Sequence, residues 1–244
     1  MWLKLNGISV LTMGLGVLAS ACGSDDEEEG SNEPFAITSP AFADGQALPA
    51  EYTCDGKNFP YSGMPPVPHT SPQLNWTSGG ANTQSYAVVF KDVTLTTATP
   101  VNELGYHWAI WNIPGSVRSL PKALGSGNPV PNLTGAQQVS GPLFDHGYIG
   151  PCPSWAVAPG APPPAEGAPA PTVSNDSYTF TVFAFSSTLT APAAPVEVPT
   201  PSGMNLSHVH ALDDFFIANA TAKVELRTTS NAQPAMFARP PAAN

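Results

Sequence analysis

The sequence predicts a β-rich domain with antiparallel pairing and one late helix, which places it in the mainly β or β-rich α+β class. Three observations predict this class. Apolar and β-branched residues recur with a period of two in several short segments. No helical pattern separates these segments in the way that βαβ units require, and a single amphipathic segment lies near the end.

The expected strands are short and bounded by polar or proline-rich stretches. They cover residues 35–38, 73–76, 85–92, 105–113, 178–186 and 222–228. A helix is expected over 204–219, with Asn205 or Ser207 as its N-cap. Prolines interrupt the pattern at 60–70, 156–172 and 192–201, which indicates surface loops because proline lacks the N–H that a sheet needs. The loop at 156–172 is either a rim of the candidate site or an inert insertion.

The first 22 residues have the pattern of a lipoprotein signal peptide. Lys4 precedes an apolar stretch that is too short to span a bilayer, and small residues lead to Cys22. We expect cleavage before Cys22 and acylation of its thiol. The alternative is an ordinary secretory signal in which Cys22 has no role. By resemblance to bacterial lipoproteins, Gly23 rather than an aspartate after the cysteine implies the outer membrane of a Gram-negative cell envelope.

Composition divides the remaining chain into three parts. Residues 23–34 form an acidic, flexible tether, residues 35–229 form the domain, and residues 230–244 form a Pro/Ala-rich tail. Beyond residue 33 the chain has seven Lys and Arg against 12 Asp and Glu, a net charge of −5. Such a chain offers no basic surface for nucleic acid.

Cysteine usage points to an oxidising compartment. If Cys22 is acylated, only Cys54 and Cys152 remain, and an even pair outside the cytosol is most simply a disulfide. The alternative is two separate buried thiols.

Five motifs, in order, resemble one known family. They are Ser71-Pro72-Gln73-Leu74-Asn75-Trp76, residues 85–92, His107-Trp108-Ala109-Ile110-Trp111-Asn112-Ile113-Pro114, Gly147-Tyr148-Ile149-Gly150-Pro151-Cys152-Pro153, and Tyr178-Thr179-Phe180-Thr181-Val182. Together they resemble the phosphatidylethanolamine-binding protein family, and its bacterial Raf-kinase-inhibitor-like branch in particular, here as an exported lipoprotein. The resemblance implies a large antiparallel sheet packed on a smaller sheet, with a C-terminal helix.

The resemblance also implies a small pocket for phosphate-like or carboxylate anions. The residues that match the family's pocket are Asp92, His107, Gly150, Pro151, Pro153 and Tyr178. This chain departs from the family pattern in three places. Val93-Thr94 follows Asp92, Ser154 replaces a proline, and Asp176 stands where a second pocket histidine is usual. An anion would be repelled if Asp176 faced the pocket.

The residue types themselves fit anion binding. A carboxylate such as Asp92 would favour protonated His107, and an imidazolium, the Tyr178 phenol and backbone N–H groups around Gly150 can all donate to an oxyanion. Taken alone, His107 is better interpreted as a buried histidine with its hydrogen bonds satisfied, and it is the combination with Asp92, Gly150 and Tyr178 that favours a pocket. By the resemblance, Cys54 and Cys152 join as a disulfide that fastens the rim of this pocket.

These features predict a non-enzymatic binding protein of the cell envelope, with a small anion or a phospholipid head group as its ligand. The alternative is an inhibitor of a protease or another partner that uses the surface around the same pocket. A hydrolase with His107 as base and Asp92 as its orienting group is disfavoured, because no nucleophile or metal set is visible. His208 and His210 diverge on a helix and cannot share a metal, and we expect no cofactor. His69 and His146 lie in loops and are expected to be solvated.

Overall fold

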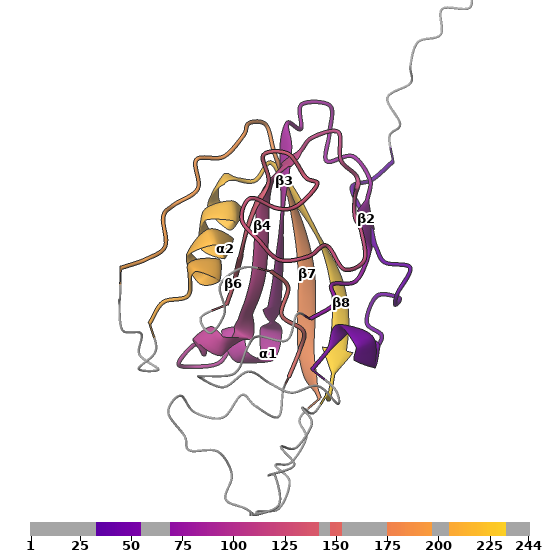
Figure 1. Cartoon of the computed structure of the whole chain (residues 1–244), viewed down its shortest axis with the longest axis vertical. Coiled ribbons are helices and arrows are strands. Elements are labelled where there is room, and N and C mark those ends of the chain that lie inside the picture. The colour runs from indigo at the N-terminus through magenta and orange to yellow at the C-terminus, as the bar shows by residue number, and fades with distance from the viewer. Residues whose placement is uncertain (1–32, 55–68, 142–146, 153–174, 197–204, 233–244) are drawn as a thin grey trace, which may run out of the picture. The chain divides into compact units, whose positions relative to one another are not determined.

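The computed structural model describes residues 33–54, 69–141, 147–152, 175–196 and 205–232. Cys22, His146, Pro153 and the loop at 156–172 lie outside these ranges. Where it is described, the chain forms two antiparallel sheets and one long helix (Figure 1). The prediction of a β-rich fold with a large sheet, a smaller sheet and a late helix is confirmed.

The larger sheet has five strands in the order β6-β4-β3-β7-β8. Their bounds are β3 Ser85–Asp92, β4 Tyr106–Pro114, β6 Gln137–Ser140, β7 Asp176–Phe185 and β8 Ala222–Ser230. The smaller sheet has the order β1-β2-β5, with β1 Ile37–Thr38, β2 Leu74–Trp76 and β5 Ser119–Leu120. The helices are α1 Val93–Thr96 and α2 His208–Asn219, with 3₁₀ turns at Ala50–Tyr52 and Glu103–Gly105.

Alternation along β3 divides the apolar side chains between the two faces of the larger sheet. Tyr86, Val88 and Phe90 face a core that includes the apolar residues of the smaller sheet, whereas Ala87 and Val89 face the core shared with α2. All five of these side chains are fully buried. The central strand is therefore covered on both faces, which explains why its sequence reads as a nearly continuous apolar run.

Helix α2 begins later than its sequence pattern predicts. The Ser207 hydroxyl accepts a hydrogen bond from the Val209 N–H at 3.2 Å, so Ser207 is the N-cap. Val209, Leu212 and Phe216 are buried against the sheet, as their spacing predicts. Figure 1 shows α2 against the larger sheet, on the side away from β2. No helix among the described residues is long and apolar enough to cross a bilayer.

Strands β5 and β6 have no clear alternation and were not among the expected elements. Strand β6 is fixed by its partner, because Val139 pairs with Ala109 and the Gln138 side chain accepts a hydrogen bond from Trp108 Nε1 at 3.0 Å. Such contacts between distant segments decide the structure of short strands, and local propensity cannot reveal them.

Candidate functional site

Asp92 ends the central strand and begins the helical turn that follows it. It pairs with Tyr178 across β3 and β7, and it is 1% exposed. Its Oδ1 accepts a hydrogen bond from the Leu95 N–H at 3.0 Å, so Asp92 is also the N-cap of α1. Its other carboxylate oxygen, Oδ2, is buried and has no hydrogen-bond partner among the described residues.

A β-bulge brings His107 to the same place. Phe90 pairs with Trp108 and Lys91 pairs with Tyr106, so His107 is the extra residue of β4. Bulges redirect side chains, and the His107 ring lies 5.3 Å from the Phe90 ring and 5.6 Å, edge-on, from the Tyr178 ring. The structure thus gathers His107 and Tyr178 around Phe90, and Asp92 lies opposite Tyr178 on the neighbouring strand. We refer to these four residues, together with Asp176, as the Asp92 cluster.

His107 is neutral, which corrects the expectation of an imidazolium. Its Nδ1 lies 3.2 Å from the carbonyl oxygen of Ile149, and because a carbonyl only accepts, Nδ1 is the donor. Burial lowers the pKa of His107 to about 4, against a smaller opposing effect of the Ile149 hydrogen bond. The expected stabilisation of the protonated ring by Asp92 does not appear among the causes. Nε2 is therefore a hydrogen-bond acceptor.

Two groups of the cluster, Asp92 and Tyr178, have raised pKa values. Burial, with a smaller contribution from the nearby Asp176, raises the pKa of Asp92 to about 6, while hydrogen bonds from Leu95, Tyr178 and Thr94 oppose the shift. Burial and the Asp92 charge raise the pKa of Tyr178 far above its usual range, so the phenol is neutral. The Tyr178 phenol lies close to the Asp92 carboxylate, and hydrogen bonding between them lowers the pKa of Asp92 and raises that of Tyr178, although Oδ2 is left without a well-formed hydrogen bond.

Asp176, the residue that departs from the family pattern, belongs to this cluster. It is the first residue of β7, two positions from Tyr178, and it is 5% exposed. Its charge raises the pKa of both Asp92 and Tyr178. The cluster consequently contains two carboxyl groups and a neutral histidine, which differs from the cationic site that the sequence predicts.

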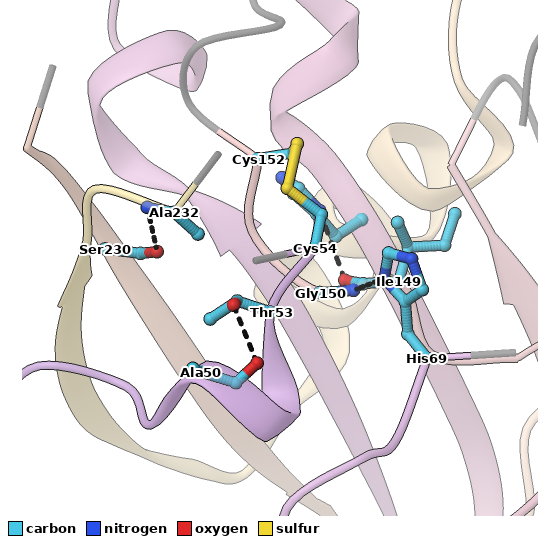
Figure 2. The surroundings of a disulfide bond; sticks show 10 residues. Ala50, Thr53, Cys54, His69, Ile149, Gly150, Cys152, Ser230 and Ala232 are labelled. Carbon is cyan, nitrogen blue, oxygen red and sulfur yellow. Dashed lines mark hydrogen bonds between the residues drawn. A yellow bond between two sulfur atoms is a disulfide. The ribbon is translucent and has the colours of Figure 1, made fainter. Parts of the chain in front are cut away.

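Gly150 contributes its backbone by close packing. A Cβ at this position would lie 2.2 Å from the carbonyl oxygen of Tyr52, so only glycine fits. Its N–H donates to His69 Nδ1 at 2.7 Å, and the next carbonyl, that of Pro151, accepts from the Cys54 N–H at 3.1 Å (Figure 2). The Gly150 N–H is therefore already used inside the protein, contrary to its expected role as a donor to an anion.

A disulfide joins this turn to the segment after the first 3₁₀ helix. Cys54 and Cys152 are bonded at 2.05 Å with their Cα atoms 5.5 Å apart. Both are buried, and Ala232, just after β8, packs against them (Figure 2). The bond thus fastens residues 149–152, which carry the hydrogen-bond partners of both nearby histidines.

His69 is the residue that sequence reasoning missed. The interpretation of His69 as a solvated side chain is wrong, because its Nδ1 accepts from Gly150 and the residue is partly buried. It also lowers the pKa of His107, and the two rings bond to consecutive residues, Gly150 and Ile149. Its hydrogen-bond partner, Gly150, is 81 residues away, and the first motif that resembles the family begins only at Ser71. No local sequence signal therefore indicated a role for His69.

The Lys and Arg side chains that the structure describes bond to groups outside the Asp92 cluster. Each of the five Lys and Arg residues in the described part of the chain bonds to an acidic side chain or a carbonyl elsewhere. The pairs are Lys91 with Asp213, Lys122 with Glu51, Lys223 with Glu225, Arg227 with Asp44, and Arg118 with the carbonyls of Gly115 and Val117.

A second group of titratable residues attaches α2 to the sheet. His210 Nδ1 lies 3.0 Å from the buried Glu103 carboxylate, and its ring stacks on Tyr106 at 4.2 Å. His208 Nε2 instead lies 3.1 Å from the carbonyl of Pro192, so the two histidines face different partners. Within the described ranges, no three His, Cys, Asp or Glu residues are placed to hold a metal ion.

Comparison with known proteins identifies the family. The family model described as "Phosphatidylethanolamine-binding protein" matches residues 38–159, which is half of the chain. The chain belongs to the phosphatidylethanolamine-binding protein family. The match includes Asp92, His107 and Gly150, and Tyr178 lies beyond its end.

Individual relatives in this family are distant. A UPF0098 protein of Aquifex aeolicus is 29% identical over 117 residues, which cover 48% of this chain and 57% of the relative. The putative lipoprotein LppC of Mycobacterium tuberculosis is 33% identical over 123 residues, covering 50% and 48%. The chain thus spans about half the length of these relatives. The crystal structure of Escherichia coli YbcL, a member of the same family, superposes with a TM-score of 0.51 at 24% identity and covers 82% of this chain and 99% of YbcL, which supports the shared fold.

Proposed function

We propose that this protein is a non-enzymatic binding protein of the cell envelope that takes a small ligand, a phospholipid head group, at the Asp92 cluster. The observation that carries the proposal is the buried Asp92 Oδ2, which has no well-formed hydrogen bond although Asp92 pairs with Tyr178, whose ring in turn contacts His107. An unpaired buried carboxylate oxygen costs folding free energy, so its retention at the end of the central strand favours a binding role.

Contacts of His107 favour binding over catalysis. A general base in a hydrolase is oriented by a carboxylate and faces a nucleophile. Here Nδ1 of His107 donates to a main-chain carbonyl, Ile149, and burial lowers its pKa to about 4, which leaves a weak base. Asp92 instead caps α1 through Oδ1.

The envelope location rests on the sequence of the first 34 residues and on a relative. Cys22 follows a lipoprotein-like signal and precedes an acidic tether, and LppC is described as a putative lipoprotein. The Cys54–Cys152 disulfide agrees with export to an oxidising compartment. Replacing Cys22 with Ser is expected to move the protein from the membrane fraction to the soluble fraction. Unchanged partitioning would contradict the lipid anchor.

The binding role is tested by adding phosphorylethanolamine to the full chain while the His107 ring protons are observed by NMR. We expect their resonances to shift at millimolar ligand, and Asp92→Asn and Tyr178→Phe to weaken the effect. Asp214→Asn is the matched control, because Asp214 is a largely exposed carboxylate on α2. If the ring protons stay unmoved, or if the control weakens binding as much as Asp92→Asn does, the Asp92 cluster is not the binding site.

A further inference from the structure

We propose that β8 pairs edge to edge with the β8 of a second copy of this chain, which makes a two-fold symmetric dimer. β8 is the last strand of the larger sheet, so among the described residues one of its edges has no neighbouring strand in that sheet (Figure 1). Such an edge presents main-chain N–H and C=O groups that another strand can bind. β8 contributes no residue to the Asp92 cluster, so this association is separate from the proposed ligand binding.

One half of this edge is covered by the segment that precedes the first 3₁₀ helix. The Arg227 N–H donates to Asp44 Oδ1 and the Arg227 carbonyl accepts from the Gly45 N–H, both at 2.8 Å. Two residues further, Thr229 bonds through its N–H and its carbonyl to residues 46 and 48. Residues 44–48 therefore cover the edge from Arg227 onward.

The other half of the edge, residues 222–226, is open, and we call it the open edge. Main-chain groups of residues two apart point to the same side of a strand, so those of Lys223 and Glu225 face outward, as those of Arg227 do. No main-chain hydrogen bond from another segment in the described part of the chain reaches these two residues on that side. They offer two N–H and two C=O groups to a partner strand.

The open edge is symmetric about Val224. The strand begins at Ala222 and its cover begins at Arg227, so Val224 is the middle residue of the open stretch. With a two-fold axis at Val224, Lys223 would exchange two main-chain hydrogen bonds with Glu225 of the second copy, and the reverse pair would do the same. The residue opposite Arg227 would precede the first residue of the other strand. The strand of each copy thus ends where the cover of the other begins.

Charge complementarity selects a second copy as the partner. Lys223 and Glu225 lie on the same face of β8, bond to each other at 3.2 Å, and have side chains that are 53% and 44% exposed. In the symmetric pair each lysine lies directly opposite a glutamate of the other copy, which gives two cross-strand pairs of opposite charge. Charged residues on an edge usually discourage pairing. Here their alternation repels a strand of uniform charge and attracts another β8.

The opposite face of the open edge is apolar. Ala222 and Val224 pack against the core between the two sheets and remain partly exposed. In the dimer, Val224 lies directly opposite Val224 of the second copy, and the pair covers apolar surface that faces water in the monomer. The open edge therefore has charged pairs on one face and an apolar contact on the other, as in an ordinary antiparallel strand pair.

Charge-swapped variants test the register of the pair. All proteins are full chains that carry Cys22→Ser, which removes the expected acylation site and its free thiol. Lys223→Glu places carboxylates opposite Glu225 of the other copy and should weaken self-association about tenfold, and Glu225→Lys should do the same with ammonium groups. A mixture of the two variants should associate as the parent protein does, because each then presents the charge that the other lacks. Sedimentation velocity at rising protein concentration measures all four samples.

A cysteine at the two-fold axis tests the contact directly. The two Val224 Cα atoms of a non-hydrogen-bonded pair would lie about 4.5 Å apart, a separation that a disulfide can span. Val224→Cys should therefore form a covalent dimer under mild oxidation at least about fivefold faster than Ala81→Cys. Ala81→Cys is the matched control, because Ala81 is an exposed residue of the turn before β3.

Three results would overturn the β8 dimer. The first is a parent protein that sediments as a monomer at every concentration, with Val224→Cys oxidised no faster than Ala81→Cys. The second is association that neither charge variant weakens, which would place the interface elsewhere. The third is a mixture of the charge variants that does not recover association. If a charge variant does not fold, the cysteine pair still decides. Neither experiment contains a ligand, so these results leave the proposed binding function untouched.

Discussion

His107 and His69 hold opposite ends of the same peptide bond. His107 Nδ1 donates to the Ile149 carbonyl at 3.2 Å, and His69 Nδ1 accepts from the Gly150 N–H at 2.7 Å. Both rings are therefore fixed in one tautomer by main-chain partners. The two histidines position the wall of the Asp92 cluster, and neither is arranged to provide positive charge.

The contact of His69 with Gly150 is expected to stabilise the fold. His69→Leu leaves the Gly150 N–H without its acceptor and should lower the free energy of unfolding by about 1–3 kcal/mol. His69→Asn places an oxygen near the position of Nδ1 and should recover most of the loss. Urea unfolding and hydrogen exchange at the Gly150 amide measure both effects. Equal losses in the two variants would show that ring packing, and not the hydrogen bond, matters.

Asp92→Asn is expected to make the protein more stable at neutral pH. The pKa of Asp92 is about 6 in the folded state and near 3.8 when unperturbed, so its ionisation destabilises the fold as pH rises through this interval. The variant should exceed the wild type by about 3 kcal/mol near pH 7.5, and the difference should vanish below about pH 3. His107 contributes with the opposite sign, but equally in both proteins. The free energy of unfolding of both proteins is measured across this pH range. A difference that stays constant with pH would show that Asp92 does not titrate as described.

Removal of the disulfide is expected to destabilise the protein without changing its fold. Cys54 and Cys152 are separated by 98 positions, and closing so long a loop constrains the unfolded chain. Cys54→Ser combined with Cys152→Ser should cost about 2–4 kcal/mol in denaturant unfolding. As a control, the wild type is unfolded with and without reductant. The free energy of unfolding in the two conditions should differ by the same amount as between the wild type and the double variant. A reductant effect that persists in the double variant would point to some other cause.

Lys91 and Asp213 form an ion pair between β3 and α2. Removal of one partner is expected to destabilise the protein. Asp213 is 2% exposed, so Lys91→Met leaves a buried carboxylate whose Oδ1 already lacks a partner. We expect a loss of about 3–5 kcal/mol. Combining Lys91→Met with Asp213→Leu should restore much of the stability, because the pair is then replaced by apolar side chains. Thermal unfolding of the single and double variants measures the coupling, and additive losses would argue against a buried pair.

The sequence predicts the frame of this protein better than the chemistry of its site. Strands β3, β4, β7 and β8 and helix α2 have local patterns strong enough to identify them, and their residues bring Asp92, His107 and Tyr178 together. The exact first and last residues of the helices and strands are set by capping side chains and by strand pairing, as at Ser207, the N-cap of α2.

What the sequence could not reveal depends on contacts between distant segments. The bulge at His107 exists only as a register shift between β3 and β4, and the role of His69 depends on a turn 81 residues later. The protonation of His107 depends on burial, which a motif does not specify, so matching the family's histidine did not establish its charge.

Lys91 and Asp92 are consecutive residues of β3 with opposite charges, and the alternation of the strand sends them to opposite faces of the sheet. Insertion of a single residue between Phe90 and Lys91 would reverse the faces on which Lys91 and Asp92 lie. The lysine would then stand among Phe90, His107 and Tyr178, and the carboxylate would approach Asp213 beneath α2. One step in the phase of a single strand thus decides whether a carboxylate or an ammonium group lies at this end of the sheet, which offers a direct route by which related chains, or a designer, could invert the charge at this position on an unchanged scaffold.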